Sequence, residues 1–355
     1  MTEIHTMLQP VLGIYGLTGA GVDVKPFGTG LINNTWAVTA GINKFILQRI
    51  NHNIFKEPND IANNIRRIGN YLSKQYPDYL FTAPEKTLQQ QDIVHIAKEG
   101  YFRLFPFVKN SHTIDVVSNT AQAFEAASQF ARFTKLLSAF PIEKLNITLP
   151  DFHNLPLRYQ QFELAMENGN KERIQEAADT INFLKQHRNI VTISEQIYQN
   201  PAFKKRVTHH DTKISNVLFD DQDKGLCIID LDTVMPGYFI SDVGDMLRTY
   251  LSPVSEEEKD LGKITIREDY FKAIAEGYLG EMKDELSAEE KDHFVYAGKF
   301  MIYMQALRFL SDYLINDIYY GSKYEGHNLL RAKNQAVLLE RLIEKESTLN
   351  KSIVH

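Results

Sequence analysis

The sequence of 355 residues contains a single cysteine, Cys227, and therefore no internal disulfide. Proteins of oxidising compartments commonly carry paired cysteines, so this count fits a reducing compartment. Cys227 lies in an apolar, strand-like run, where a buried and inert thiol is the expected state. We therefore expect neither a disulfide framework nor cysteine chemistry.

An excess of positive charge is also absent. The 39 Lys and Arg residues stand against 45 Asp and Glu residues, which gives a formal net charge of -6. Electrostatic binding to nucleic acid or to a membrane surface depends on a diffuse basic surface, which this composition does not provide. Any anionic ligand must be held by a local arrangement, and we expect no nucleic-acid, membrane or protein partner.

Long apolar runs are missing as well. No window approaches the 18 uncharged apolar residues of a membrane helix. The first ten residues have neither the basic start nor the apolar stretch of a signal peptide, so we expect a soluble, cytoplasmic protein. The 43% hydrophobic and 24% charged content is that of an ordinary globular protein.

The chain has two parts of different texture. In the first hundred residues, glycines separate short apolar segments such as Trp36–Val38 and Phe45–Leu47, and apolar residues recur at helical spacing between residues 60 and 76. Beyond Asn110, patterns of amphipathic helices cover residues 120–140, 172–187, 270–279, 289–316 and 329–346. We expect an α+β protein with an antiparallel-sheet lobe and one main helix over residues 1–107, and a larger, mainly helical lobe over residues 108–355.

The most informative stretch is His209-His-Asp-Thr-Lys-Ile-Ser-Asn216. Two apolar strands and a turn follow it, which predicts an antiparallel hairpin with Asn216 opposite Asp230 at its open end. Directly paired residues have Cβ atoms about 4.5–5.5 Å apart. An amide oxygen and a carboxylate at that separation suit Mg²⁺, which prefers oxygen ligands.

Asp211 and Lys213 lie on the loop that enters this hairpin. A carboxylate that orients an attacking hydroxyl, a cation near the moving phosphoryl group and a metal site are the parts that phosphoryl transfer needs. The spacing matches the kinase catalytic loop His-x-Asp-x-Lys-x-x-Asn. The competing interpretation, a plain hairpin with polar ends, leaves the order of these elements unexplained.

A second signal is Gly28-Thr-Gly30, which lies between two strand candidates. A tight glycine turn there would bring backbone N–H groups onto nucleotide phosphates, although such a turn is also common in ordinary hairpins. On the next strand, Arg49 would point to the phosphates if Leu47 faces the adenine. The following helix offers no well-placed glutamate to pair with Arg49.

Together, the segment 209–216, Asp230 and the segment 237–245 resemble the aminoglycoside phosphotransferase and choline kinase superfamily. Within it, the chain is most similar to the N-acetylhexosamine 1-kinases, over the stretches 30–36, 47–51, 152–159, 308–320 and 327–331. The resemblance implies a protein-kinase-like bilobal fold. It also implies that ATP, with Mg²⁺, phosphorylates the anomeric hydroxyl of N-acetylglucosamine or N-acetylgalactosamine. The sequence has no Asp-Phe-Gly motif, and no Ala-Pro-Glu follows the segment 209–216, which argues against a protein substrate.

The resemblance also implies roles for individual residues. Asp211 would be the base or orienter of the hydroxyl, and Asn216 and Asp230 would hold magnesium, with Asp232 as a second ligand or a supporting residue. The nucleotide would be bound by Gly28, Thr29, Gly30, Arg49 and the hinge from Phe107 to Lys109. The sugar would meet Arg308, Tyr319 and Tyr250.

Some alternatives stay open at this point. Arg308 could instead form an ion pair with Asp312, four residues further along a helix. The acceptor could be another small alcohol, of the choline, homoserine or aminoglycoside type. A pseudokinase is disfavoured because Asp211, Asn216 and Asp230 are all present, and a metal-dependent hydrolase is disfavoured because its His/Asp cluster is missing.

Overall fold

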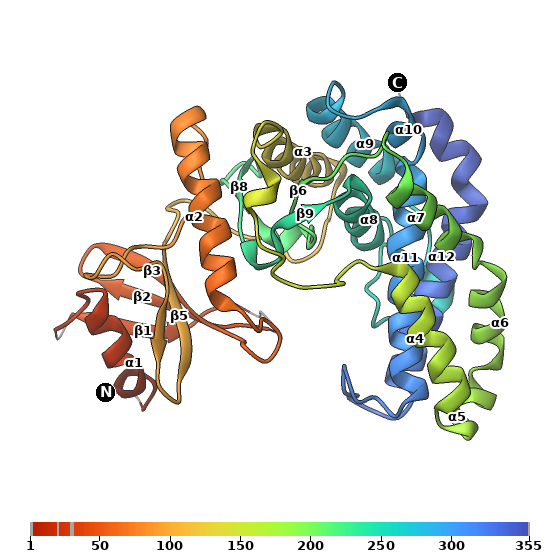
Figure 1. Ribbon diagram of the computed structural model, residues 1–355, viewed down its shortest axis with the longest axis horizontal. Coiled ribbons are helices and arrows are strands. Elements are labelled where there is room, and N and C mark those ends of the chain that lie inside the picture. The colour runs from red at the N-terminus through yellow and green to blue at the C-terminus, as the bar shows by residue number, and fades with distance from the viewer. Residues whose placement is uncertain (1–2, 20, 29–31, 354–355) are drawn as a thin grey trace.

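A computed structural model describes residues 3–19, 21–28 and 32–353. Figure 1 shows a sheet-containing N-terminal part on one side and a larger assembly of helices on the other. This arrangement confirms the predicted α+β class, with an antiparallel sheet in the first part and helices in the second. Within the described residues, no helix combines the length and the apolar character that crossing a membrane would require.

The N-terminal part is a five-stranded antiparallel sheet of order β1-β2-β3-β5-β4 with two helices. Its elements are α1 (Glu3–Ile14), β1 (Val22–Pro26), β2 (Asn34–Ala40), β3 (Asn43–Ile50), α2 (Pro58–Gln75), β4 (Val94–Ile96) and β5 (Gly100–Pro106). The predicted helix 60–76 is therefore confirmed as α2. Its apolar stripe is buried as the spacing required, with Ile61, Ile65, Ile68 and Leu72 all at or below 1% exposure.

The two faces of this sheet belong to different cores. Leu47 of β3 packs with Leu8 and Leu12 of α1 on one face. Ile50 of the same strand belongs to the core that continues through α2 into the helical part. Successive residues of a strand point to opposite faces. The β3 side chains two positions from Leu47 therefore share its α1 face, and those next to it point to the α2 face.

The helical part begins after the β5 strand and contains most of the core. Its helices are α3 (Thr120–Leu136), α4 (Leu155–Asn168), α5 (Lys171–Glu176), α6 (Ala178–Gln186), α7 (Asn189–Gln199), α8 (Phe239–Tyr250), α9 (Glu268–Met282), α10 (Ala288–Asp292), α11 (Phe294–Leu314) and α12 (His327–Ser352). Short strands form two pairs, β6 (Arg206–Thr208) with β9 (Met235–Gly237), and β7 (Val217–Phe219) with β8 (Gly225–Ile228). Four 3₁₀ turns complete it, η1 (Ile142–Lys144), η2 (Ile214–Asn216), η3 (Leu231–Thr233) and η4 (Leu261–Lys263).

The sequence patterns located some helices and missed others. Residues 172–187 form two helices, α5 and α6, and residues 289–316 break at His293 into α10 and α11. Helices α1, α4, α7 and α8 were not predicted. In α8 the polar residues Ser241, Asp242 and Asp245 are buried together with the apolar ones.

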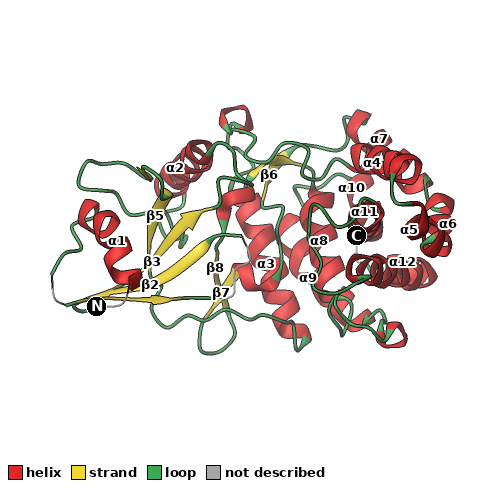
Figure 2. Cartoon of the chain, turned by 90° about the horizontal axis from the view of Figure 1, so that it is seen from below, coloured by secondary structure: helices red, strands yellow, loops and turns green. Residues whose placement is uncertain are grey.

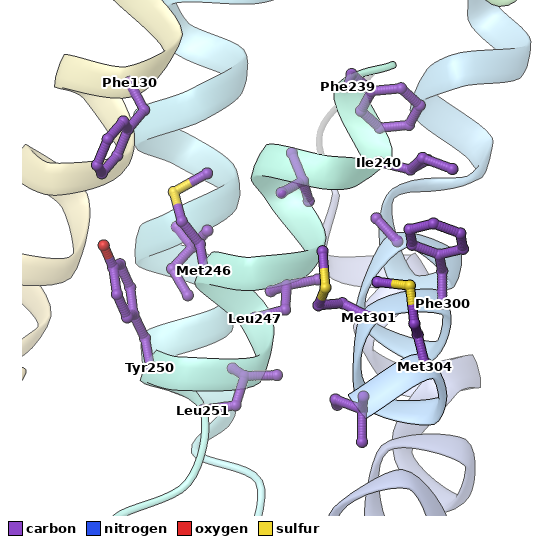
Figure 3. Close-up of a cluster of buried hydrophobic side chains, with 14 of the residues drawn as sticks. Phe130, Phe239, Ile240, Met246, Leu247, Tyr250, Leu251, Phe300, Met301 and Met304 are labelled. Atoms are coloured by element: carbon purple, nitrogen blue, oxygen red, sulfur yellow. The ribbon is translucent and has the colours of Figure 1, made fainter. Parts of the chain in front are cut away.

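Helices α8 and α11 cross at close range in the centre of the helical part (Figures 2 and 3). Met246 and Leu247 of α8 lie near Met301 and Met304 of α11 in this buried cluster (Figure 3). The approach depends on Gly244, because a Cβ placed there would lie 2.4 Å from the Ala297 carbonyl oxygen and 2.9 Å from the Met301 Cβ.

We expect Gly244→Ala to lower the free energy of unfolding by about 1–3 kcal/mol, since overpacking forces the two helices apart. Gly280→Ala in α9 is the matched control. A Cβ at Gly280 meets nothing within 4 Å, so alanine there should leave stability unchanged or raise it by about 0.4–1 kcal/mol. Urea denaturation of both variants checks this, and equal effects at the two sites would contradict the packing argument.

Candidate active site

The loop that precedes the β7–β8 hairpin is held in place by one carboxylate of α8. Asp242, in the first turn of α8, accepts hydrogen bonds from the backbone N–H groups of His209 (3.0 Å) and His210 (2.7 Å). The His209 ring lies between the Ile229 carbonyl, 3.0 Å from its Nε2, and the Asp211 N–H, which donates to its Nδ1 at 3.3 Å. Both ring nitrogens of His209 are thus hydrogen-bonded, and the ring connects the loop to the hairpin.

Thr212 anchors the same loop from the other side. Its N–H donates to Asp245 (2.8 Å), its hydroxyl to the Asp242 carbonyl (2.7 Å), and its own carbonyl accepts the Tyr250 hydroxyl (2.6 Å). Tyr250 is 1% exposed and lies in the core cluster of Figure 3. The expectation that Tyr250 forms a wall of the sugar site is therefore corrected: it is a buried support of the loop.

Asp211 is the carboxylate that this loop presents. Its Oδ2 accepts from Lys213 Nζ at 2.9 Å and from Asn216 Nδ2 at 3.0 Å. Burial acts to raise the pKa of Asp211, but the positive charge of Lys213 and these hydrogen bonds outweigh it and hold the pKa below its usual value. Asp211 is accordingly ionised at neutral pH and suited to accept a hydrogen bond from a hydroxyl group.

The hairpin itself forms as predicted, but its register differs by one residue. Val217 pairs with Ile228, and the Ile229 N–H donates to the Asn216 carbonyl, so Asn216 lies opposite Ile229 rather than Asp230. The difference arises in the turn, where Phe219 pairs with Gly225 and the Asp220 N–H donates to the Lys224 carbonyl. A β-bulge between Leu218 and Phe219 then offsets part of it. Asp230 follows in the left-handed conformation, with φ of 60°.

Asp230 is half-buried beside the carboxylates of Asp232 and Asp211. Burial, followed by the neighbouring charge of Asp232, raises the pKa of Asp230 to about 7, while Lys213 acts in the opposite direction. Carboxylates crowded in this way lower their free energy when a cation arrives. Asp230 is therefore the group in this site that most needs a metal ion.

The donor set fits Mg²⁺ bound together with a nucleotide. Asn216 uses its amide nitrogen on Asp211, which directs its amide oxygen elsewhere. In the described part of the chain, no three His, Cys, Asp or Glu side chains are grouped to hold a metal ion. Mg²⁺ characteristically takes one or two protein ligands and completes its shell with phosphates and water, so a two-donor site of Asn216 and Asp230 suits it.

Asp232, which the sequence left as a second ligand or a support, is already paired. Its Oδ1 lies 2.5 Å from Nη1 of Arg103, and its Oδ2 accepts from Asn33 Nδ2 at 2.8 Å. Both partners belong to the N-terminal part, Arg103 to β5 and Asn33 to the segment before β2. Asp232 therefore joins the two parts of the molecule, and we assign it the supporting role.

The cation expected on β3 lies on the wrong face. Because Leu47 packs against α1, the side chain of Arg49 shares that face and not the one toward α2. Arg49 donates to Asn34 Oδ1 at 2.9 and 3.2 Å and lies 3.9 Å from Glu99. The prediction that Arg49 binds phosphates rested on Leu47 facing the adenine, and that premise is wrong.

The nucleotide loop and hinge were predicted from residues 28–30 and 107–109. Gly28 has a φ of +76°, which favours glycine, and nothing lies within 4 Å of a Cβ built there. Thr29 and Gly30 lie outside the described residues. At the predicted hinge, the Phe107 N–H donates to the Lys44 carbonyl (3.1 Å). This N–H is therefore already used, and the predicted contact with adenine would need other backbone groups between Phe107 and Lys109.

A group of histidines and arginines adjoins the loop that carries Asp211. His210, which precedes Asp211 and has a φ of 67°, places its Nδ1 3.4 Å from Nδ1 of His153. Burial, then His210, and then the charges of Arg308, Arg248 and Arg158 hold the pKa of His153 well below its usual value. Both imidazoles are therefore neutral at pH 7, and the positive charge of the region comes from the arginines.

Arg308 is not paired with Asp312, which corrects that alternative. Asp312 instead accepts from the backbone N–H groups of Tyr319 (2.7 Å) and Tyr320 (2.9 Å) and so anchors the segment after α11. The Arg308 guanidinium lies 5.9 Å from the Tyr319 ring centre and 5.5 Å from that of Tyr320. Tyr319 is 72% exposed, so it stands at the open edge of this region.

Sequence reasoning missed four residues of this site: Gln48, Arg103, His153 and Arg158. His153 and Arg158 stood within a stretch noted for its resemblance, yet nothing local marked them as functional. Arg103 lies in the apolar run 101–105, whose pattern indicates a strand and gives no sign of a functional residue. Strand parity was the available signal, since Gln48 and Arg103 pair directly between β3 and β5 and share the face opposite Leu47.

An α+β fold of two parts, with the Asp211 loop followed by a hairpin that carries Asn216 and Asp230, is the arrangement expected of a kinase-like phosphotransferase. The family described as "Phosphotransferase enzyme family" (APH) matches residues 23–281. Since this match covers well over half of the sequence, the chain belongs to that family.

Solved structures show the same fold. A microcompartment-associated aminopropanol kinase is 14% identical, with a TM-score of 0.66, over 97% of this chain and 98% of that one. An amicoumacin kinase in complex with AMP-PNP, Ca²⁺ and Ami is 12% identical, with a TM-score of 0.61, over 96% and 94%. The choline kinase of Cryptosporidium parvum is 13% identical, with a TM-score of 0.58, over 98% and 97%.

Proposed function

We propose that the protein is an ATP-dependent kinase that phosphorylates the anomeric hydroxyl of N-acetylglucosamine or N-acetylgalactosamine. The products would be the sugar 1-phosphate and ADP. The observation that carries the choice of acceptor is a pair of arginines beside the catalytic loop. Within the described residues, neither Arg158 nor Arg308 forms an ion pair, and both charges act on His153, whose ring meets His210 next to Asp211.

Two unpaired guanidinium groups are poor surroundings for a cationic acceptor. Choline would be bound by aromatic faces and carboxylates around its quaternary ammonium. Burial, and then the charge of Arg308, lower the pKa of Arg158. An acceptor that offers oxygen atoms and no positive charge relieves this repulsion.

A guanidinium donates in a fixed fork, which matches sugar hydroxyls or an acetamido carbonyl. Arg158 uses Nη1 on Gln161 and Nη2 on the Asp151 carbonyl, while its buried Nε has no partner. Arg308 makes one long bond, 3.3 Å, to Gln305. Tyr319 and Tyr320 would supply the flat apolar surface against which a sugar ring packs.

In the proposed reaction, the anomeric oxygen forms a bond to the γ-phosphorus as the bond from that phosphorus to the β,γ-bridging oxygen breaks. Asp211 orients the hydroxyl and takes its proton, and ADP leaves with the bridging oxygen. Lys213 neutralises charge on the transferred group. Bound at Asn216 and Asp230, Mg²⁺ would compensate the charge of the nucleotide phosphates.

We further propose that ATP lies between residues 1–107 and 108–355, near the glycine turn and the hinge at Phe107 and Lys109. The buried, unpaired Cys227 supports a cytoplasmic location. We propose no partner other than ATP and the sugar.

A panel of acceptors tests the proposal by ADP release: N-acetylglucosamine, N-acetylgalactosamine, choline, ethanolamine, homoserine and an aminoglycoside. We expect turnover of at least one N-acetylhexosamine and, by phosphorus NMR, a 1-phosphate product. Homoserine is the second candidate, because its carboxylate also suits Arg158 and Arg308. Brisk turnover of choline with none of either sugar would refute the acceptor assignment, and a 6-phosphate product would refute the anomeric mechanism.

Arg308→Ala should raise the KM for the sugar about tenfold or more, because it removes a donor that we assign to the acceptor. The KM for ATP should stay within twofold of the wild type. Arg341→Ala, on the exposed face of α12, controls for the loss of one cation at the surface. Steady-state kinetics with each substrate varied in turn checks this, and an effect on ATP alone would contradict the assignment.

A further inference from the structure

One buried ion pair among the described residues, Arg103 with Asp232, joins the sheet to the helical part. Both residues are 2% exposed, and Nη1 of Arg103 lies 2.5 Å from Oδ1 of Asp232. Burial of two charges is costly unless they are paired and hydrogen-bonded. The two charges are paired, and each side chain makes a further hydrogen bond, Arg103 to Gln48 and Asp232 from Asn33. The facing atoms, Nη1 and Oδ1, are in ion-pair contact without the alignment of a hydrogen bond.

Gln48 of β3 lies on the face of the sheet opposite Leu47 and Arg49. It pairs directly with Arg103 across the β3–β5 ladder. Its Oε1 accepts from Nε of Arg103 at 3.1 Å and from Nη2 at 2.8 Å. The neutral amide therefore stands beside a guanidinium that reaches the same face from the neighbouring strand.

Helix α2 offers no carboxylate for an ion pair with the sheet. Asp60, at its first turn, is its one acidic residue and accepts from Asn146 Nδ2 at 2.7 Å. Further along, the fully buried Asn64 bonds to the backbone of Asn146 and to the Val234 carbonyl. Amide contacts, not charges, tie α2 to the helical part.

Protein kinases require an ion pair between a β3 lysine and a glutamate of the following helix, which must be in place for activity. We propose that Arg103 and Asp232 form the equivalent pair in this protein, with Arg103 as the sheet cation and Asp232 as its carboxylate partner. The cation has moved from β3 to β5, and the carboxylate from α2 to the segment directly after Asp230. This inference rests on the kinase activity proposed above.

Arg103 is a positioning residue in this arrangement. Through Asp232 it holds the segment that carries Asp230, two residues earlier, and the Asn33 contact ties the end of the glycine turn to the same carboxylate. The Asn33 Oδ1 also accepts from the Asn51 N–H at 3.0 Å, which fixes this side chain between β2 and the residue after β3. Loss of the pair should thus disturb the binding of MgATP and leave the acceptor side unaffected.

The test is the double variant Arg103→Met/Asp232→Asn, which removes both charges and leaves no buried charge unpaired. MgATP binding is measured by thermal shift without any acceptor, and kinetics give the KM for each substrate. We expect at least a tenfold loss of MgATP affinity, a similar rise in the KM for MgATP, and an unchanged KM for the acceptor. The melting temperature without nucleotide should stay within a few degrees of the wild type.

A variant that moves the cation from β5 to β3 tests whether the charge, and not the packing of Arg103, carries this role. Gln48→Lys combined with Arg103→Met places a lysine beside the former guanidinium with Asp232 intact. We expect this variant to bind MgATP at least threefold more tightly than Arg103→Met/Asp232→Asn. Arg49→Met decides between the two candidate cations and should leave MgATP affinity within twofold of the wild type.

Wild-type MgATP affinity in the folded double variant would overturn the proposal. So would a tenfold loss in Arg49→Met with none in the double variant, or equal effects on the KM of both substrates. A wild-type protein that binds MgATP but phosphorylates neither sugar would refute the acceptor assignment alone, because the binding measurement needs no acceptor.

Discussion

Asp211→Asn should lower kcat by about three orders of magnitude and leave the affinity for MgATP within threefold of the wild type. The amide keeps the shape of the side chain and its contact with Asn216, but it cannot take the proton of the attacking hydroxyl. A positioned acid or base typically contributes a factor of 10²–10⁴. Single-turnover kinetics with saturating ATP and acceptor measure the loss at the chemical step.

The matched control is Asp221→Asn, in the exposed turn of the same hairpin. It changes the same functional group near the same loop, and kcat should not change. Unaltered kcat in Asp211→Asn would remove Asp211 from the reaction. A large loss of MgATP affinity would instead assign Asp211 to the metal, which its bonds to Lys213 and Asn216 do not suggest.

Asp230→Asn should lower kcat at least as much, by a factor of about 10³ or more, because it removes the carboxylate assigned to Mg²⁺. A bound metal is worth several kcal/mol of charge stabilisation in the transition state. We expect raised Mg²⁺ concentrations to restore little of the activity. Initial rates measured against Mg²⁺ at saturating ATP check this.

The same substitution should not destabilise the metal-free protein. Burial and the neighbouring Asp232 raise the pKa of Asp230 to about 7, so an ionised Asp230 costs the native state free energy above that pH. We expect Asp230→Asn at pH 8 and without metal to melt at or above the wild-type temperature. A marked drop in melting temperature would mean that Asp230 is mainly a structural residue.

The predicted hairpin after the segment 209–216, which depended only on short-range spacing, agrees well with the structure. The segment from His209 to Asn216 lies within eight residues, and the hairpin after it is closed by its own turn. Such local order is visible in a sequence because neighbours in the chain are also neighbours in space. Even here, the position of the turn, offset in part by a β-bulge, made Ile229 and not Asp230 the partner of Asn216.

The assignment of Arg49 failed for a physical reason that applies to every strand. A strand has a period of two, so the choice of which face is buried decides the direction of every side chain at once. The sequence showed the alternation of Leu47, Gln48 and Arg49 but not which face met α1. That depended on packing with Leu8 and Leu12, residues outside the strand.

The sequence by itself determined the fold class, the family resemblance and the catalytic loop, because each follows from composition, periodicity or a fixed spacing of residue types. Only the tertiary structure decided that Arg49 lies on the α1 face of the sheet, that Arg103 pairs with Asp232, and that, among the described residues, Arg158 and Arg308 form no ion pair. These contacts join residues far apart in the chain. Their identity follows from how helices and strands pack, which no local pattern encodes.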